Sequence, residues 1–119
     1  MGARINYVFK ANMEEPYITL YSHWGESTWF QDLANSISAA RSRWTDDSYC
    51  LRIIIDQLTK ESRDVDTGHG IFLSTTEDLK YLDHPVIIDM QAMTILDTDG
   101  TEFGWEEFLK IYKPNEFPA

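Results

Sequence analysis

The chain has 119 residues, of which 43% are hydrophobic and 25% charged, a composition that suits one globular domain and excludes a disordered chain. Its 20 acidic and ten basic residues give a net charge of −10, which disfavours direct binding to a nucleic-acid backbone because phosphates are bound by clustered lysine and arginine. No apolar run approaches the ~20 residues of a membrane-spanning helix, and the single cysteine excludes an internal disulfide bond.

The first predicted elements are two strands. Residues 4–10 alternate, with Ile5, Tyr7 and Phe9 on one face, which is the pattern of a half-buried strand. Residues 17–22 form the second strand, after a turn whose proline cannot donate to a strand ladder. We expect the two strands to form a hairpin.

Two helices follow these strands. Ser27 predicts the start of a helix that runs to about Arg43 and carries an apolar stripe. Asp46 predicts the N-cap of a second helix that runs to about Lys60. The apolar residues of the second helix cover more than half of its circumference, so we expect several neighbours to cover it. Its Cys50 lies among these apolar residues, which indicates a buried thiol in a reducing compartment.

The remaining segments are mostly strands. A polar loop precedes a short strand at 70–74, and strands at 85–89 and 93–97 are placed to pair across the residues between them. The Asp99-Gly100 dipeptide predicts a tight turn, and residues from Gly104 onward predict a final amphipathic helix.

The predicted order β-β-α-α-β-β-β-α indicates an α+β fold, a mostly antiparallel sheet with helices packed on one face. We expect one domain over residues 1–113 and a frayed tail over 114–119. The N-terminus has no hydrophobic signal core, so we expect a cytoplasmic protein.

The charge is unevenly distributed along the chain. Residues 1–63 carry eight acidic and seven basic residues, a net of −1, whereas residues 64–119 carry 12 acidic and three basic residues, a net of −9. An acidic half of this kind keeps the protein soluble, binds divalent cations, meets a basic protein surface or mimics nucleic acid.

The junction Ser22-His23-Trp24-Gly25 is the strongest candidate site, because polar and aromatic groups at the end of a strand are held rigidly and still exposed. An unperturbed histidine titrates near pH ~6.5, so His23 suits proton transfer or hydrogen bonding. Trp24 either contacts a ligand or closes the edge of the core. The candidate binding residues are Ser22, His23, Trp24, Arg43, His69 and His84.

The sequence contains no motif for catalysis. It has no glycine-rich phosphate loop, no nucleophile elbow and no closely spaced pair of metal ligands. The segment Asp97 to Gly100 is similar to the start of a calcium loop but fits a hairpin turn better. We therefore predict no catalytic residue, no cofactor and no bound metal. One alternative is a zinc or manganese site, built from histidines with Asp64, Asp66 and Asp83.

Several segments resemble a group of short, uncharacterised proteins of tailed bacteriophages. The resemblance rests on residues 1–10, MGARINYVFK, and residues 20–25, LYSHWG, with shorter matches at 43–46 and 83–89. It implies a phage origin and expression in the cytoplasm of a bacterial host, and it carries over no activity.

The leading hypothesis is a non-enzymatic accessory protein that binds a host protein with a basic surface, without contacting nucleic acid or membrane. One alternative is a nucleotide or small-ligand binding protein that uses the His23-Trp24 junction, with phosphate contacts from Arg4, Arg41, Arg43 and Arg52. A metal-dependent hydrolase is the other alternative, and a homodimer is compatible with each.

Overall fold

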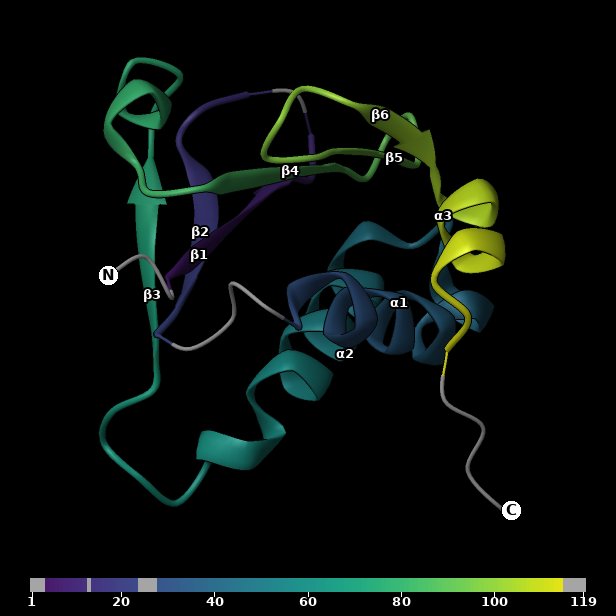
Figure 1. The fold of residues 1–119 in the computed structure, drawn as a ribbon, viewed down its shortest axis with the longest axis horizontal. Helices are drawn as coiled ribbons and strands as arrows, with labels where there is room; N and C mark the ends of the chain where they lie inside the picture. Colours follow the sequence, from purple (N-terminus) through teal and green to yellow (C-terminus); the bar gives the residue numbers. More distant parts are fainter. Residues whose placement is uncertain (1–3, 13, 24–27, 115–119) are drawn as a thin grey trace.

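The protein is described by a computed structural model that places residues 4–12, 14–23 and 28–114. Within these residues, the strands form one sheet in the order β3-β2-β1-β4-β5-β6, and the three α-helices lie on one side of it (Figure 1). The strands are β1 (Ile5–Lys10), β2 (Tyr17–Ser22), β3 (His69–Ser74), β4 (Pro85–Asp89), β5 (Thr94–Leu96) and β6 (Glu102–Gly104). The α-helices are α1 (Trp29–Ala39), α2 (Asp47–Thr59) and α3 (Trp105–Ile111), and the short 3-10 helices are η1 (Arg41–Arg43), η2 (Lys60–Ser62) and η3 (Asp78–Tyr81).

The sheet is mostly antiparallel, which confirms the predicted α+β class. The β1–β2 hairpin and the β4–β5 pair form as predicted. β1 and β4 pair in parallel, with Tyr7 opposite Val86. Parallel neighbours need a long connection, and the chain between β1 and β4 supplies one through β2, the helices and β3. None of the described helices is long and apolar enough to cross a membrane.

The C-terminal hairpin differs from the prediction by one strand. β6 pairs with β5 in antiparallel register, with Phe103 opposite Ile95. Three residues with one apolar side chain are too short to show strand periodicity, so the sequence did not predict β6. The Asp99-Gly100 turn joins the two strands, and Gly100 has a φ of +91°, which suits glycine.

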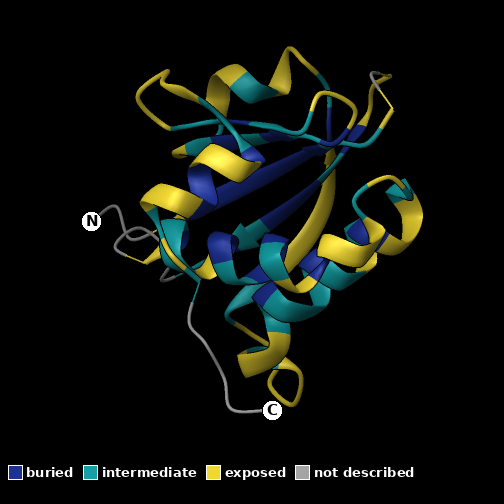
Figure 2. Ribbon diagram, turned by 90° about the vertical axis from the view of Figure 1, so that its right-hand side faces the viewer, coloured by how far each residue is buried: buried dark blue, intermediate teal, exposed yellow. Residues whose placement is uncertain are grey.

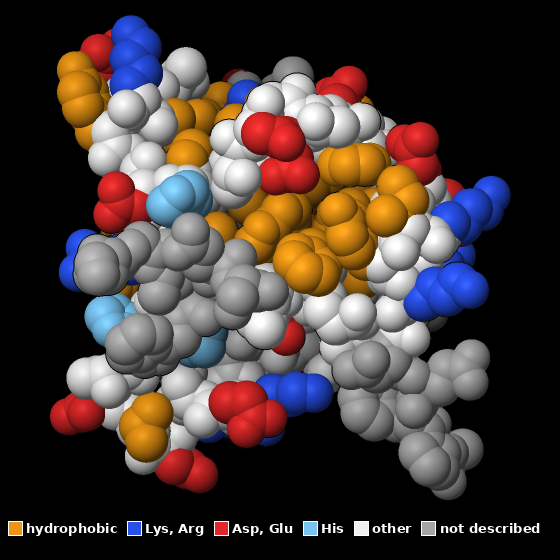
Figure 3. All heavy atoms as spheres, in the orientation of Figure 1, with side chains coloured by type: hydrophobic (Ala, Val, Ile, Leu, Met, Phe, Trp, Pro, Cys, Tyr) orange, Lys and Arg blue, Asp and Glu red, His pale blue; other side chains and the backbone are white. Residues whose placement is uncertain are grey.

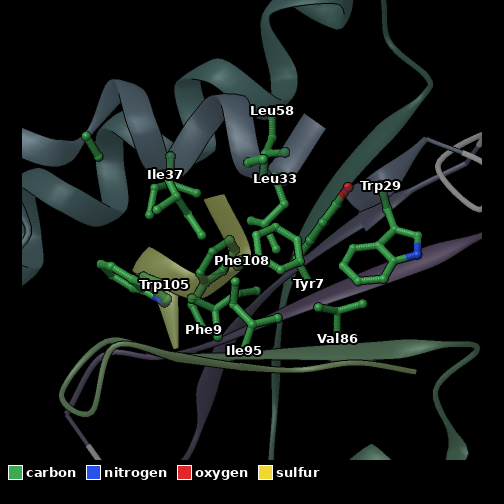
Figure 4. Packing of buried hydrophobic residues seen from close by; sticks show 14 of the residues in the cluster. Tyr7, Phe9, Trp29, Leu33, Ile37, Leu58, Val86, Ile95, Trp105 and Phe108 are labelled. Atoms are coloured by element: carbon green, nitrogen blue, oxygen red, sulfur yellow. The ribbon is translucent and has the colours of Figure 1, made fainter. Parts of the chain in front are cut away.

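The core lies between one face of the sheet and the helices. Tyr7 and Phe9 of β1 point toward Leu33 and Ile37 of α1, and Phe108 of α3 fills the space between them (Figure 4). The residues coloured as buried accordingly gather between the sheet and the helical layer (Figure 2). This packing confirms that the helices cover one face.

The helix boundaries correct two expectations. α1 ends at Ala39 instead of near Arg43, and the indole of Trp44 folds back to donate a hydrogen bond to the carbonyl of Ile37 at 2.9 Å. The predicted cap Ser27 lies outside the described residues, as do residues 115–119 of the predicted tail. Asp46 caps α2 as predicted, because its carboxylate accepts the backbone N–H of Tyr49.

The expectation that several neighbours cover α2 is wrong. α2 packs on α1 at the outside of the helical layer, and only Cys50, Ile54 and Leu58 are buried. Tyr49 is 53% exposed, since a helix with one neighbour needs only one buried stripe.

Candidate functional site

Three of the candidate residues meet at one end of the sheet. β2 ends at Ser22, which lies opposite His69, the first residue of β3, and His23 follows directly. The histidine side chains lie on the left-hand side of the surface shown in Figure 3. His84 precedes β4 at the same end but is exposed, and its carbonyl accepts the backbone N–H of Asn6 at 3.4 Å. It lines neither of the hollows formed by the other two histidines.

His23 is held through both its ring and its backbone. Its Nδ1 lies 2.8 Å from the hydroxyl of Tyr21, and its backbone N–H donates to the carbonyl of Gly68 at 2.9 Å. Gly68 has a φ of +98°, a conformation that favours glycine, so this turn is specified by the sequence. Both His23 and His69 line a shallow hollow of about 590 Å³.

His69 is joined to the helical layer through Ser62. Its Nδ1 lies 2.7 Å from the Ser62 hydroxyl oxygen, and that hydroxyl is also 3.1 Å from the carbonyl of Thr59, to which it donates. Burial lowers the pKa of His69 below its usual value, and the negative charge of Asp32 opposes this shift. The imidazole is therefore neutral near pH 7.

A polar cavity of about 620 Å³ opens beside this pair. It lies between α1, the end of α2 and the start of β3. Its lining includes Ser22 at the end of β2, Asp32 and Ser36 of α1, and Gln57 of α2. His69 borders both this cavity and the shallow hollow, as do Thr67 and Gly68 just before it, so the two share this corner of the molecule.

Arg43 does not belong to this site. Its guanidinium lies over the ring of Tyr49, 5.1 Å from the centroid, at the junction between α1 and α2. Arg41 lies over Trp44 and pairs with Glu106, and neither arginine lines the polar cavity. The arginines that the nucleotide hypothesis assigned to phosphate are thus not gathered there. Trp24 lies outside the described residues.

The histidines and aspartates do not converge on a metal site. In the described part of the chain, no group of three or more His, Cys, Asp or Glu side chains is placed to hold an ion. Asp83, a predicted ligand, lies 3.8 Å from Arg4 instead.

The second notable feature is the free edge of β3. β3 pairs with β2 on one side, and within the described residues no strand lies on its other side (Figure 1). Ile71 and Leu73 are each 61% exposed and Phe72 is 39% exposed. Ile71 and Leu73 are in register with Leu20 and Ile18 on the helix-covered face, but the helices do not reach over β3.

Acidic residues surround both ends of β3. Asp64 and Asp66 precede the strand, and Glu77 and Asp78 follow it, all of them exposed. The nearby bases Arg63 and Lys80 pair with Asp56 and Glu77, so acidic charge remains in excess at both ends. Glu15, from the turn between β1 and β2, accepts the backbone N–H of Thr76 at 3.1 Å and is thereby held beside the same end. The strand itself carries no Asp, Glu, Lys or Arg.

No protein-family model, curated protein or solved structure matches this chain. The functional interpretation therefore depends on the geometry of the molecule.

The sequence predicted some of these features and missed others. It placed a strand at residues 70–74 but did not indicate that this strand is at an edge, because strand order depends on long-range pairing. It identified Ser22, His23 and His69. It missed Ser62 and Asp32, which come from separate elements and have no local pattern that marks them.

Proposed function

We propose that this protein binds a basic host protein, without catalysis, by adding an extended segment of that protein to the free edge of β3. An edge strand presents a row of backbone N–H and C=O groups that a second strand can pair with. Edge strands are commonly protected by charged residues, by proline or by short length. β3 is six residues long and contains no Asp, Glu, Lys or Arg and no proline. The exposure of Ile71 and Leu73, 61% each, is the observation that carries the proposal.

The charges around β3 favour a basic segment. Asp64 and Asp66 lie before the strand, and Glu77 and Asp78 lie after it. A partner with apolar residues in its centre and lysine or arginine at both ends complements this arrangement, which speeds encounter and fixes register. The phage resemblance supports a bacterial protein as the partner and the host cytoplasm as the location.

A second copy of the chain fits the edge less well. Antiparallel pairing of two β3 strands brings Asp64 and Asp66 of one copy beside Glu77 and Asp78 of the other. Like charges placed together in this way oppose association. Each copy also carries a net charge of −10, which adds to the repulsion.

The test uses a synthetic peptide of alternating valine and threonine flanked by lysines, and a counterpart flanked by glutamates. We expect the first to bind and the second not to bind, as measured by fluorescence anisotropy. Ile71→Lys should weaken binding about tenfold or more, because it removes an apolar contact and adds a repelling charge. Ile111→Lys is the matched control, since Ile111 is 52% exposed on α3 and distant from β3.

Three results would overturn the proposal. The first is equal affinity for both peptides, and the second is equal weakening by Ile71→Lys and Ile111→Lys. The third is a concentration-dependent dimer, seen by analytical ultracentrifugation, that Ile71→Lys dissociates. That last result would assign the edge to a second copy.

A further inference from the structure

The polar cavity beside His69 is lined by a hydroxyl group that the fold does not use. Ser22 lines this cavity and is only 8% exposed. Among the described residues, its side chain has no hydrogen-bond partner. In the part of the chain that the structure describes, no buried side-chain nitrogen or oxygen lacks a partner, so the Ser22 oxygen is open to the cavity and not sealed in the core. Ser22 is therefore a group that a ligand in the cavity can satisfy.

His69 offers a second unused group. The hydroxyl of Ser62 has one proton and donates it to the carbonyl of Thr59 at 3.1 Å. The 2.7 Å bond between Ser62 and His69 then takes its proton from Nδ1 of the imidazole. The Nε2 atom of neutral His69 is left as a hydrogen-bond acceptor.

The charged side chains that line the cavity are net negative. They are Asp32, Glu61 and Lys60. Lys60 also has an interaction of its own, and one lysine does not offset two carboxylates, so the charge of the lining remains negative by one. Thr28 donates to only one carboxylate oxygen of Asp32, at 3.1 Å, which leaves the other oxygen as an acceptor. This balance disfavours phosphates and carboxylates as ligands.

An ammonium group matches this negative charge and the acceptors on Asp32 and His69, because it is a cation with three donors and no acceptor. Leu58 and Val65 lie in the same lining and supply apolar contact for an alkyl chain. The cavity volume of about 620 Å³ lies within the range of small-molecule sites.

We propose that this cavity binds the ammonium end of an alkylamine, with Ser22, Asp32 and His69 accepting its hydrogen bonds. The ammonium belongs either to a free diamine or to a lysine side chain of a bound protein. The site stands independently of strand addition at β3, since it faces the helical layer and uses side chains instead of the strand edge.

The test is a titration with cadaverine, a diamine, followed through backbone amide chemical shifts. We expect saturable shifts at the residues that line the cavity. Asp32→Asn and Ser22→Ala should each weaken binding about tenfold, the usual effect of losing a hydrogen bond to a charged group. Asp99→Asn is the matched control, because it removes the same charge from an exposed turn outside the cavity and should leave affinity within about twofold.

Equal weakening by Asp32→Asn and Asp99→Asn would overturn the proposal, since it would show only general attraction of a cation to an acidic protein. Absence of saturable binding of either probe, or binding of inorganic phosphate with equal affinity, would overturn it as well. A second probe identifies the source of the ammonium: a short peptide with one lysine, compared with its norleucine analogue. Saturable cadaverine binding supports a free amine, whereas binding of the lysine peptide alone supports a protein side chain.

Discussion

The Nδ1 atom of His69 lies 2.7 Å from the hydroxyl oxygen of Ser62. This hydrogen bond joins the first residue of the free edge strand β3 to η2, which directly follows α2. The bond and the burial around it hold the imidazole in one orientation, at the border of both hollows. His69 therefore connects the stability of the fold with the chemistry of the site.

Lowering the pH should destabilise the protein through His69. Burial places the pKa of His69 in the folded protein below its unfolded value, so the unfolded chain binds the proton more readily. The free energy of unfolding is unaffected above the unfolded pKa of about 6.5 and falls as the pH drops below it, toward the folded pKa. Urea denaturation at about pH 7.5 and about pH 5.5 measures this loss.

The variant His69→Asn should show a smaller loss of stability over the same pH interval. His84→Asn is its control, because His84 is exposed and lines neither hollow. Identical pH dependence in the wild type and in His69→Asn would contradict the assignment of a buried, neutral imidazole.

Truncation in the core should cost far more stability than truncation at the β3 edge. Ile37→Ala removes a fully buried side chain of α1 and should lower the free energy of unfolding by about 2–5 kcal/mol. Ile71→Ala removes a side chain that is 61% exposed and should change it by less than about 0.5 kcal/mol. Chemical denaturation compares them, and a large loss in Ile71→Ala would indicate that β3 is covered within the protein.

The cap of α2 should contribute measurably to stability. Asp46 accepts the backbone N–H of Tyr49 at 3.4 Å, a long bond, so Asp46→Ala should cost about 1 kcal/mol or less. Asp66→Ala removes the same charge from an exposed loop and should have little effect. Equal losses in the two variants would show that the cap contributes nothing beyond charge.

Cys50 should be inert in the folded protein. Its side chain is fully buried, and burial, with the nearby charges of Asp47 and Asp46, raises the pKa of its thiol to about 11. Thiolate is the reactive form, so a disulfide reagent such as DTNB should react only on unfolding. Immediate reaction of the native protein at neutral pH would contradict this burial.

Binding of the lysine-flanked peptide should weaken as salt is added. The acidic residues around β3 are exposed, and interactions between exposed charges are screened within about 8 Å at physiological ionic strength. We expect the association rate, measured by stopped-flow fluorescence, to fall more than the dissociation rate rises. A rate that is independent of salt would exclude electrostatic steering.

The sequence predicted most of the elements because their patterns are local. Alternation in residues 5–9 identified β1, and the Asp46 cap identified the start of α2. Prediction from the sequence failed for the elements whose ends or pairing depend on contacts between distant residues. The indole of Trp44 folds back onto the end of α1, and β6 is recognisable only through its pairing with β5.

The candidate site was predicted in part for the same reason. Ser22 and His23 are marked by their place at the end of a strand, and the register of β2 with β3 brings His69 to them. Ser62 and Asp32 join the site through the packing of η2 and α1, which no sequence pattern reveals. Arg43, which the sequence grouped with Ser22 and His23, lies apart from the cavity, since its guanidinium lies over Tyr49.

Hydrogen–deuterium exchange with and without the lysine-flanked peptide tests strand addition most directly. Because a bound strand pairs with the free backbone groups of β3, we expect the peptide to slow exchange of amides within His69–Ser74 and to leave α3, at the other edge of the sheet, unchanged. Saturating peptide that leaves exchange in β3 unaltered, or that protects a different element instead, would contradict the proposed function.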